Sequence, residues 1–430
     1  MNIRLSKSQI ISNASLTITG SKSETNRLLL LQALFPNFQI EKISNSDDSE
    51  VMLEAIKNST QNPKNPIQIN VHHAGTAMRF LTAFFAIQEN CEVILNGSKR
   101  MQERPIKILV EALRELGAAI FYENQEGYPP LKIIGKNLKK NKVTLAANIS
   151  SQYISALLLI APKLENGLEL ILEGEITSVP YIQMTLALLN EIGVETSFER
   201  NIIKVKKFQF TNSKFQTQNS KLKTPNSNLL TVESDWSSAS YFYSIVALSN
   251  IGAQITLSNY KKNSLQGDAV VTEIYQDFGV ETIFSENSIS IKKTHSEYPK
   301  SKIINLKSSP DIAQTIAVTC FGLGVSCHFT GLHTLKIKET DRLEALRNEL
   351  TKLGAHISVT DDSLILEISN KINENIAIKT YQDHRMAMAF APLAIKTPII
   401  IEEAEVVSKS YPTFWEDLQK IGFKIEKFPP

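Results

Sequence analysis

Residues 20–34 read GSKSETNRLLLLQAL, in which a cluster of small polar and charged residues is followed at once by an apolar run. The same arrangement recurs about every 75 residues, as expected of one supersecondary unit copied several times. The other copies are AGTAMRFLTAFFA from Ala74, SSQYISALLLIAP from Ser150, SSASYFYSIVAL from Ser237, DIAQTIAVTCFG from Asp311 and DHRMAMAFAPLAI from Asp383. Each copy predicts a helix whose N-terminal N–H groups and dipole favour anions. Six such helix starts predict a strongly anionic ligand.

A second recurring element is an amphipathic helix that ends at a glycine suited to the left-handed C′ position. The five glycines are Gly117, Gly193, Gly279, Gly354 and Gly422, and an apolar residue lies four positions before each, as one buried helix face requires. Strand-like runs follow, such as LKIIG, IIKVKKF, SISIKK and SLILEI. The chain is therefore predicted to be an α/β protein of about six units, each with strands and two helices.

Length and composition predict an ordinary soluble protein of two domains. A chain of 430 residues is too long for one compact core, and 42% hydrophobic with 21% charged residues is typical of globular proteins. The net charge of +2 gives no support for nucleic-acid or membrane binding, and no apolar run approaches the ~20 residues of a membrane helix. The N-terminus does not resemble a signal peptide, and three cysteines lack metal or redox spacing. We expect a cytoplasmic protein with reduced cysteines.

The segment from Ile202 to Val232 contains no Asp or Glu and is rich in Lys, Asn, Ser, Gln and Thr. We interpret it as a solvated hairpin or inter-domain excursion, with a basic ligand-binding arm as the alternative. A domain boundary near its end, together with pairing of the strand-like residues 3–18 to the far domain, predicts two domains. They comprise residues 20–232, and residues 1–19 with 233–430.

Charged residues gather at the predicted helix starts. Lys22 and Arg27 add positive charge to the first helix, and Gly75 permits a close ligand approach to the second. Pro105 suits a helix N1 position, so Arg100 and Arg104 would flank another start, where arginine is the usual residue for gripping carboxylate or phosphate. A capped basic helix end, close helix packing and a surface ion-pair cluster are the respective structural alternatives. The His72–His73 pair has no metal partners at ligand spacing, so we expect no metal site.

The second half of the chain combines acids with bases. KETDR at 338–342 precedes a predicted helix, and Asp383, His384 and Arg385 open an apolar one. Charges at the mouth of a buried helix are costly unless a ligand or counter-charge satisfies them. Asp311 and Lys409 complete a set that suits anionic substrates and proton transfer, with a structural ion network as the alternative. The fourth copy, from Ser237, contributes no site residue that we would assign.

Taken in order, these strings resemble the enolpyruvyl transferase family. The strings are GSKSETNR, AGTAMRFL, RMQERPI, SSQY, SVPY, PDIAQTIA, KETDRL, DHRMAMAF and SKSYPTF, and they extend over nearly the whole chain. The resemblance implies an inside-out α/β barrel of two domains, each with three βαβαββ-like units. It also implies transfer of the enolpyruvyl group of phosphoenolpyruvate to the 5-hydroxyl of shikimate 3-phosphate, with release of phosphate through a tetrahedral intermediate, in chorismate and aromatic amino acid biosynthesis. We expect no cofactor, no metal, no nucleic-acid or membrane partner, and a monomer.

The resemblance also implies the roles of individual residues. Asp311 and Glu339 match the carboxylates of proton transfer, with Asp311 as the base for the hydroxyl and either Glu339 or Lys22 as the proton donor to carbon. The shikimate 3-phosphate contacts, mostly in the N-terminal domain, would be Lys22, Ser23, Arg27, Ser150, Ser151, Gln152, Ser178, Tyr181, Asp311 and Lys338. The phosphoenolpyruvate contacts would be Lys22, Gly75, Arg100, Gln152, Arg342, His384, Arg385 and Lys409. Because Gly75 is retained, glyphosate, a phosphonate competitor of phosphoenolpyruvate, is expected to inhibit.

Four positions depart from the family pattern, namely Thr19, His73, Phe80 and Thr334. Thr334 occupies a position that often holds a substrate-binding asparagine, so it is left out of the predicted site. A sister activity on UDP-N-acetylglucosamine is the first alternative, but its reactive loop cysteine has no counterpart here, because Cys91 lies in an apolar run. The second alternative is a non-catalytic phosphate or nucleic-acid binder, which leaves Asp311, Glu339 and Asp383 unexplained.

Overall fold

A computed structural model describes residues 1–58, 66–147, 150–209, 229–369 and 371–429. The chain forms two compact units. The continuous unit consists of Gly20–Val232, and the discontinuous unit combines Met1–Thr19 with Glu233–Pro430. Most of the Lys- and Asn-rich segment at 210–228 lies outside the described residues, so its expected hairpin or arm remains a prediction.

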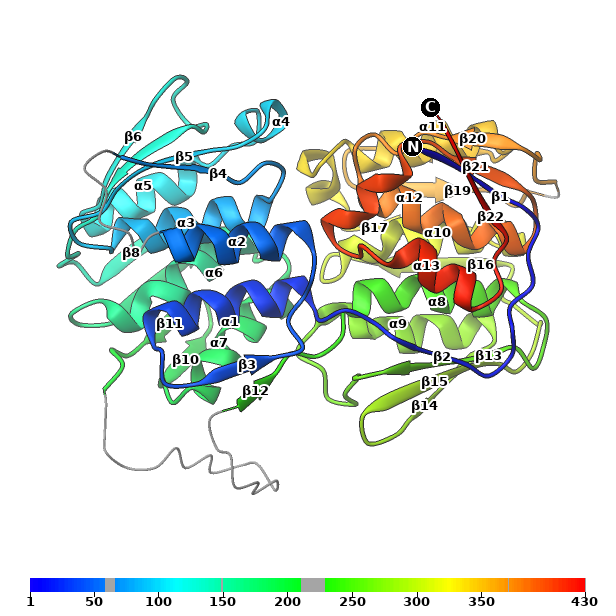
Figure 1. Ribbon diagram of the computed structural model, residues 1–430, viewed down its shortest axis with the longest axis horizontal. Helices are drawn as coiled ribbons and strands as arrows, with labels where there is room; N and C mark the ends of the chain where they lie inside the picture. Colours follow the sequence, from blue (N-terminus) through cyan, green and yellow to red (C-terminus); the bar gives the residue numbers. More distant parts are fainter. Residues whose placement is uncertain (59–65, 148–149, 210–228, 370, 430) are drawn as a thin grey trace. The chain divides into compact units, whose positions relative to one another are not determined.

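The described strands of the continuous unit form three sheets (Figure 1). In the first, the order is β4 (Ile67–Asn70), β5 (Glu92–Asn96), β7 (Leu131–Ile134), β6 (Ala119–Tyr122). In the second it is β10 (Thr196–Glu199), β11 (Ile202–Val205), β9 (Leu168–Glu173), β8 (Lys142–Ala146). The third pairs β12 (Leu229–Thr231) with β3 (Gln39–Glu41). The helices are α1 (Lys22–Leu34), α2 (Asp47–Asn58), α3 (Gly75–Ala86), α4 (Lys99–Gln102), α5 (Lys107–Leu116), α6 (Ser151–Ile160), η1 (Ala161–Lys163) and α7 (Val179–Glu191).

The discontinuous unit repeats this plan with three four-stranded sheets. Their orders are β14 (Val280–Phe284), β15 (Ser288–Lys293), β13 (Gln254–Ser258), β2 (Ala14–Thr17); β16 (Ser301–Asn305), β17 (Ser326–Thr330), β19 (Leu364–Leu366), β18 (Ile357–Val359); and β20 (Ile376–Ile378), β21 (Ile399–Ile401), β1 (Asn2–Leu5), β22 (Ile425–Phe428). The α-helices are α8 (Trp236–Leu248), α9 (Val271–Ile274), α10 (Ala313–Leu323), α11 (Arg342–Lys352), α12 (His384–Phe390) and α13 (Phe414–Lys420). The 3₁₀ helices are η2 (Gly267–Val270), η3 (Tyr275–Phe278), η4 (Pro310–Ile312), η5 (His333–Ile337), η6 (Ala391–Ile395) and η7 (Ala404–Lys409).

Each four-stranded sheet contains one parallel pair extended by antiparallel strands. In one example β4 runs parallel to β5, and β5, β7 and β6 then pair in antiparallel fashion. A parallel pair needs a crossover, and here α3 supplies it between β4 and β5. The repeat predicted strands with two helices in each unit, and the family resemblance implied this βαβαββ-like arrangement.

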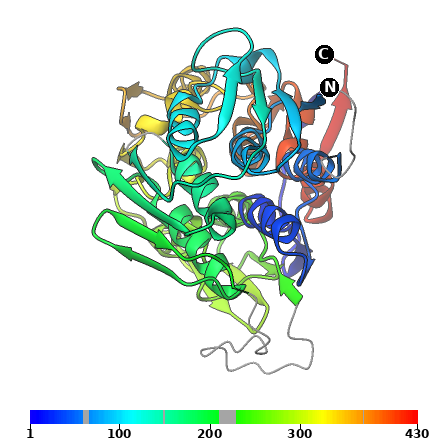
Figure 2. The ribbon, with the colours of Figure 1, turned by 90° about the vertical axis from the view of Figure 1, so that its left-hand side faces the viewer.

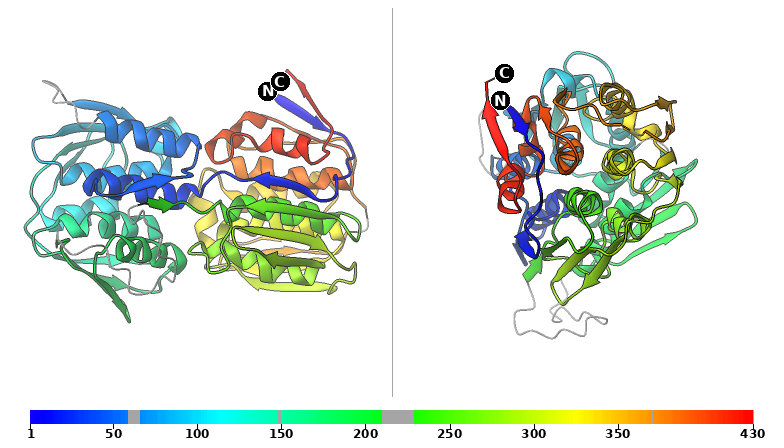
Figure 3. Two further views of the ribbon diagram at one scale, coloured as in Figure 1. Left: turned by 60° about the horizontal axis from the view of Figure 1, so that its bottom comes forward. Right: turned by 90° about the vertical axis from the view of Figure 1, so that its right-hand side faces the viewer.

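The helices that follow the six polar clusters are the apolar ones, and they lie inside their units. Every residue of α3, α8 and α12 is buried, which is possible because these helices are apolar nearly all round. Figure 2, with the continuous unit facing the viewer, and the right-hand view of Figure 3, with the discontinuous unit facing, both show helices in the middle and sheets at the rim. The predicted inside-out arrangement is confirmed.

The predicted helix ends are also confirmed, with one difference. Gly117, Gly193, Gly279, Gly354 and Gly422 all have positive φ, between 73° and 110°. The segment before Gly279 is not one regular helix, because α9 gives way to the 3₁₀ helix η3 after only four residues. Tyr275 in η3 is still fully buried, so the apolar face persists although the coil tightens.

The N-terminal strands pair with the distant part of the chain, as predicted. β1 lies between β21 and β22, and β2 runs parallel to β13. The strand that precedes α8 in sequence, β12, pairs instead with β3 of the continuous unit. The chain therefore passes twice between units, and at each passage a strand stays with the unit that the chain is leaving.

Candidate functional site

Arg342, the first residue of α11, lies at the centre of a buried charge cluster in the discontinuous unit. Its Nε donates to Asp383 Oδ2 at 2.7 Å. Its two Nη atoms donate to Asp311 Oδ1 at 2.9 Å and to Glu339 Oε2 at 2.8 Å. Burial opposes the charge of Arg342, but the three carboxylates outweigh burial and raise its pKa above the ordinary value. One guanidinium therefore holds three mutually repelling carboxylates together.

Asp311, in η4, is surrounded by cations. Lys338 Nζ lies 3.4 Å from its Oδ1, and Arg385 Nη2 donates to its Oδ2 at 3.1 Å. Burial would raise the pKa of Asp311, but Arg385, Lys338 and Arg342 lower it well below its usual range. Asp311 is consequently an anion at neutral pH in the protein without substrates.

The start of α12 holds the next group of predicted residues. Asp383 is the N-cap, and its Oδ1 accepts from the backbone N–H of Arg385 at 2.9 Å. His384 and the apolar residues after it are buried, which fixes the charged helix start against the core. Lys409, at the end of η7, donates to the carbonyl of Gln382 at 2.6 Å, directly before this helix start. The structure thus brings all seven predicted site residues of the discontinuous unit to adjoining segments, namely Asp311, Lys338, Glu339, Arg342, His384, Arg385 and Lys409.

In the continuous unit, Ser21 caps α1 by accepting from the N–H of Glu24. Lys22, the first residue of α1, forms an ion pair with Asp48 in the first turn of α2, at 3.1 Å. The cap and the ion pair hold the Lys22 ammonium at the start of α1, where the helix dipole already favours an anion.

Arg27 is a buried guanidinium that donates hydrogen bonds to four neutral groups. It donates to the Thr185 hydroxyl at 2.8 Å, the Ser155 hydroxyl at 3.0 Å, and the carbonyls of Ser23 and Tyr181. Burial lowers the pKa of Arg27 to about 10, against the opposing effects of Tyr181 and Glu24. Arg27 therefore remains a cation at neutral pH, and it links Ser23 in α1 to Tyr181 in α7.

The start of α3 is open to an anion. Ala74 is the N-cap and its side chain makes no capping bond, so the first-turn N–H groups keep their donor capacity. The guanidinium of Arg104 lies beside it, since a Cβ built on Gly75 would come within 2.7 Å of Arg104 Nη1. A helix N-terminus with an adjacent guanidinium fits phosphate or carboxylate.

The start of α6 adjoins that of α3. Ser150 caps α6 by accepting from the N–H of Gln152, and Gln152 Nε2 donates to the Thr76 hydroxyl at 3.2 Å. Ser151, the first residue of α6, is buried. Ser178, the N-cap of α7, has a φ of 52°, a left-handed conformation that is uncommon for a residue with a side chain.

Arg100 and Arg104 differ from the expected arrangement. Arg100 lies in α4 with its side chain 43% exposed, and it pairs with Glu103 at 3.2 Å. Arg104 is buried beside Gly75. Pro105 is not the first residue of a helix, because α5 begins two residues later, and its carbonyl accepts from Arg79 and Tyr153 instead. The geometry brings Arg104, rather than Arg100, to the start of α3.

Sequence reasoning passed over several residues at these clusters. Asp48 was missed because one more acid in an acidic helix start carries no signal. Ser237 was assigned no role, yet its hydroxyl accepts from Arg385 Nη2 at 3.3 Å. Its place at a repeated helix start was the signal that could have identified it. Phe80, a departure from the family pattern, is fully buried, and its ring centroid lies 5.3 Å from Arg27 Cζ.

The described residues include no group of three or more His, Cys, Asp or Glu side chains that could hold a metal ion. In the His72–His73 pair, the His73 ring nitrogen lies 2.9 Å from the Ser98 hydroxyl. Among the described helices, none combines the length and the apolar character needed to cross a bilayer.

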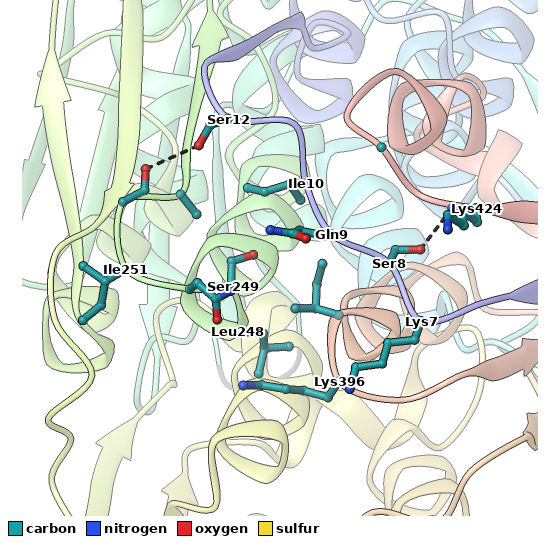
Figure 4. A pocket seen from close by; sticks show the side chains of 15 residues that line it. Lys7, Ser8, Gln9, Ile10, Ser12, Leu248, Ser249, Ile251, Lys396 and Lys424 are labelled. Carbon is teal, nitrogen blue, oxygen red and sulfur yellow. Dashed lines mark hydrogen bonds between the residues drawn. The ribbon is translucent and has the colours of Figure 1, made fainter.

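A hollow of about 780 Å³ lies elsewhere on the discontinuous unit (Figure 4). Its lining includes three exposed lysines, Lys7, Lys396 and Lys424, and none of the candidate site residues. Burial and the charge of Lys7 lower the pKa of Lys396. The hollow is separate from the charge cluster around Arg342, so it contributes nothing to the arrangement of the candidate site.

Comparisons with known proteins agree along the whole chain. Residues 8–418 match the family model of EPSP synthase (3-phosphoshikimate 1-carboxyvinyltransferase). A 3-phosphoshikimate 1-carboxyvinyltransferase of Bacteroides fragilis is 44% identical over 421 residues, covering 96% of each chain. One of Haemophilus influenzae is 35% identical and covers 95% of this chain and 96% of its own. The solved structure of EPSP synthase from Acinetobacter baumannii, 22% identical, has the same fold with a TM-score of 0.75 over 99% of this chain and 100% of that one. The chain belongs to the EPSP synthase family and has its activity, that of a 3-phosphoshikimate 1-carboxyvinyltransferase of the shikimate pathway.

Proposed function

We propose that the two clusters divide the family's reaction between the units. In this proposal the continuous unit binds shikimate 3-phosphate, and the discontinuous unit supplies the acid–base carboxylates and much of the grip on phosphoenolpyruvate. The observation that carries the proposal is Asp311, a carboxylate that is only 14% exposed and contacts Arg342, Arg385 and Lys338. An acceptor for a hydroxyl proton and cations for a departing phosphate are thereby combined in one cluster.

The reaction in this proposal is an addition followed by an elimination. The 5-hydroxyl oxygen of shikimate 3-phosphate bonds to C2 of phosphoenolpyruvate, its proton goes to Asp311, and C3 gains a proton. The tetrahedral intermediate then loses phosphate from C2 and a proton from C3, which restores the double bond. Positioning and charge stabilisation supply the catalysis without a covalent nucleophile.

Substrate binding provides a reason why Asp311 can act as a base. In the free protein Arg342 and Arg385 lower its pKa, which makes it a weak base. Bound phosphoenolpyruvate places its phosphate and carboxylate beside these guanidiniums. Its negative charges offset the positive potential that the guanidiniums produce at Asp311. The pKa of Asp311 then moves upward, toward the value a general base needs.

The proton for C3 comes from Glu339 or from Lys22. Glu339 accepts a hydrogen bond from Arg342, and Lys22 is paired with Asp48. The solvent isotope effect on turnover, measured for Glu339→Gln and Lys22→Met, would identify the proton donor. The donor is the residue whose substitution alone removes an isotope effect that does not depend on viscosity.

The proposed contacts for shikimate 3-phosphate remain those expected from the family pattern. They are Lys22, Ser23, Arg27, Ser150, Ser151, Gln152, Ser178 and Tyr181, with Asp311 and Lys338 from the discontinuous unit. For phosphoenolpyruvate we propose Lys22, Gly75, Gln152, Arg342, His384, Arg385 and Lys409. To these we add Arg104 in preference to Arg100, because Arg104 is the buried guanidinium next to the open start of α3.

The direct test is turnover of phosphoenolpyruvate with shikimate 3-phosphate, followed by phosphate release and by detection of the enolpyruvyl product. We expect turnover with this pair and none when UDP-N-acetylglucosamine replaces shikimate 3-phosphate. Arg104→Met is expected to raise KM for phosphoenolpyruvate at least tenfold, whereas Arg100→Met changes it less than threefold. The reverse order of these two effects would return the role to Arg100.

Gly75→Ala is expected to weaken binding of phosphoenolpyruvate and of glyphosate. The added methyl group would lie 2.7 Å from Arg104 Nη1, so the guanidinium must move away from the start of α3. We expect KM for phosphoenolpyruvate to rise by about tenfold, because a charge-assisted contact is lengthened. Inhibition constants for glyphosate should rise as well. Equal glyphosate inhibition of Gly75→Ala and the wild type would contradict the prediction.

A further inference from the structure

Asp268 is a buried carboxylate that the reaction described above does not use. It lies in η2 and is 2% exposed. Its Oδ2 accepts from the Ser237 hydroxyl, while its Oδ1 has no hydrogen-bond partner among the described residues. The Ser309 hydroxyl donates to the carbonyl of Gly267 at 2.9 Å and holds η2 beside η4. Burying a carboxylate with one unpartnered oxygen costs free energy of folding. The cost indicates that the charge of Asp268 has a role that a neutral residue could not fill.

Ser237 connects this carboxylate to the charge cluster. Its oxygen accepts from Arg385 Nη2 at 3.3 Å, while its proton points to Asp268. Arg385 also donates to the carbonyl of Asp311 and to Asp311 Oδ2, both at 3.1 Å. The guanidinium of Arg385 is thus held on one side by Asp311 and on the other by Ser237 with Asp268 behind it.

We propose that Asp268 is a positioning residue that fixes the Arg385 guanidinium for phosphoenolpyruvate by way of Ser237. The proposal rests on the proposed role of Arg385 in binding phosphoenolpyruvate. An ionised Asp268 only accepts hydrogen bonds, so the Ser237 proton must point toward it and the Ser237 lone pairs face Arg385. A neutral Asp268 can donate its own proton to Ser237, which then competes with Arg385 for the same oxygen.

The charge state of Asp268 is expected to change near pH 6. Burial raises the pKa of Asp268 to about 6, with Asp311 and Asp235 adding to the rise and Arg385 and Ser237 opposing it. These groups come from η4, α8 and α12. Glu273, in the adjoining α9, is exposed. Above about pH 6, ionised Asp268 therefore leaves the Ser237 oxygen free to accept from Arg385. Below about pH 6, neutral Asp268 competes with Arg385 for that oxygen.

The test compares Asp268→Asn, Ser237→Ala and the double variant with the wild type, using kcat and both KM values from pH 5.5 to 8.5. At pH 8 we expect each single variant to raise KM for phosphoenolpyruvate about tenfold and to leave KM for shikimate 3-phosphate within twofold. The double variant should be no worse than the singles, because all three remove the same link. The ratio of wild-type to Asp268→Asn kcat/KM for phosphoenolpyruvate should fall toward one below about pH 6.

This ratio removes the titration of the substrate's own phosphate, because that titration affects both proteins equally. Asp417→Asn is the matched control. Asp417 is likewise buried, and its partners Tyr411, Thr413 and Lys420 are not proposed site residues, so its loss should lower Tm without changing KM. If Asp268→Asn does not fold, Ser237→Ala gives the same KM test alone.

A ratio that stays constant across the pH range, or additive effects in the double variant, would overturn the role of Asp268. Arg385→Lys separates this failure from a failure of the proposed function. If Arg385→Lys leaves KM for phosphoenolpyruvate unchanged, the role of Arg385 itself is wrong. If Arg385→Lys raises that KM and neither Asp268→Asn nor Ser237→Ala does, only the inference about Asp268 is wrong.

Discussion

Asp311→Asn is expected to lower kcat by about 10²–10⁴-fold, because the substrate hydroxyl loses its base. An amide cannot accept the proton, yet it nearly matches the carboxylate in shape, so the buried cluster keeps its packing. KM for phosphoenolpyruvate should change less than kcat, or even fall, since Arg342 and Arg385 lose a competing carboxylate. Steady-state rates of phosphate release would measure both constants.

The contrast with Asp383→Asn sharpens this test. Asp383 also contacts Arg342, but it caps α12 and is completely buried, so its loss should reduce Tm and affect kcat only through the positions of Arg342 and Arg385. A kcat of Asp311→Asn within tenfold of the wild type would remove Asp311 from the acid–base step.

Arg342→Met is expected to cost about 3–5 kcal/mol of folding free energy and to abolish measurable turnover. The substitution keeps much of the side-chain volume, but it leaves three carboxylates in a buried cluster without the guanidinium that joins them. Removing one partner of a buried ion pair usually destabilises by that amount, because the remaining charge stays desolvated. Thermal and urea unfolding of the two proteins would measure the difference.

The stability difference should depend on pH. In the wild type the pKa of Asp311 is lowered, so its contribution to stability is fully present above the unfolded value near 4 and is lost as pH falls. Arg342→Met lacks part of that contribution to stability, because Asp311 loses its ion pair with Arg342. The gap in unfolding free energy is therefore expected to be largest near neutral pH and to narrow below pH 4. Arg347→Met, on an exposed part of the same helix, should change stability by less than about 1 kcal/mol and leave activity intact.

The repeat and its helix starts could be predicted from the sequence because local chemistry determines them. A polar cluster followed by an apolar run indicates a capped, buried helix, and α1, α3, α6, α8, α10 and α12 all begin at or within three residues of such clusters. The glycines that end the amphipathic helices could be predicted for the same reason, because a positive φ at a helix end is a local backbone requirement that favours glycine.

What the sequence could not provide was the partner of each charged side chain. Arg100 and Arg104 are four residues apart in one motif, and only the fold shows that Arg104 is buried beside Gly75 while Arg100 pairs with Glu103. The link from Asp268 through Ser237 to Arg385 joins three helical segments that are distant in sequence, and no spacing rule connects them. Long-range contacts of this kind depend on tertiary packing rather than on propensity.

The pairing of β1 with β21 and β22 has a consequence for the newly made chain. After its synthesis, β1 waits for partners that are encoded about 400 residues later. At the usual pace of synthesis this delay is on the order of 20–80 s. The stretch from Gly20 to Val232 meets a delay about half as long, because its most distant paired strands, β3 and β12, pair Gln39 with Leu229. Biogenesis is consequently sequential, and the half that carries Asp311 and Arg342 matures only after β21 and β22 have been made.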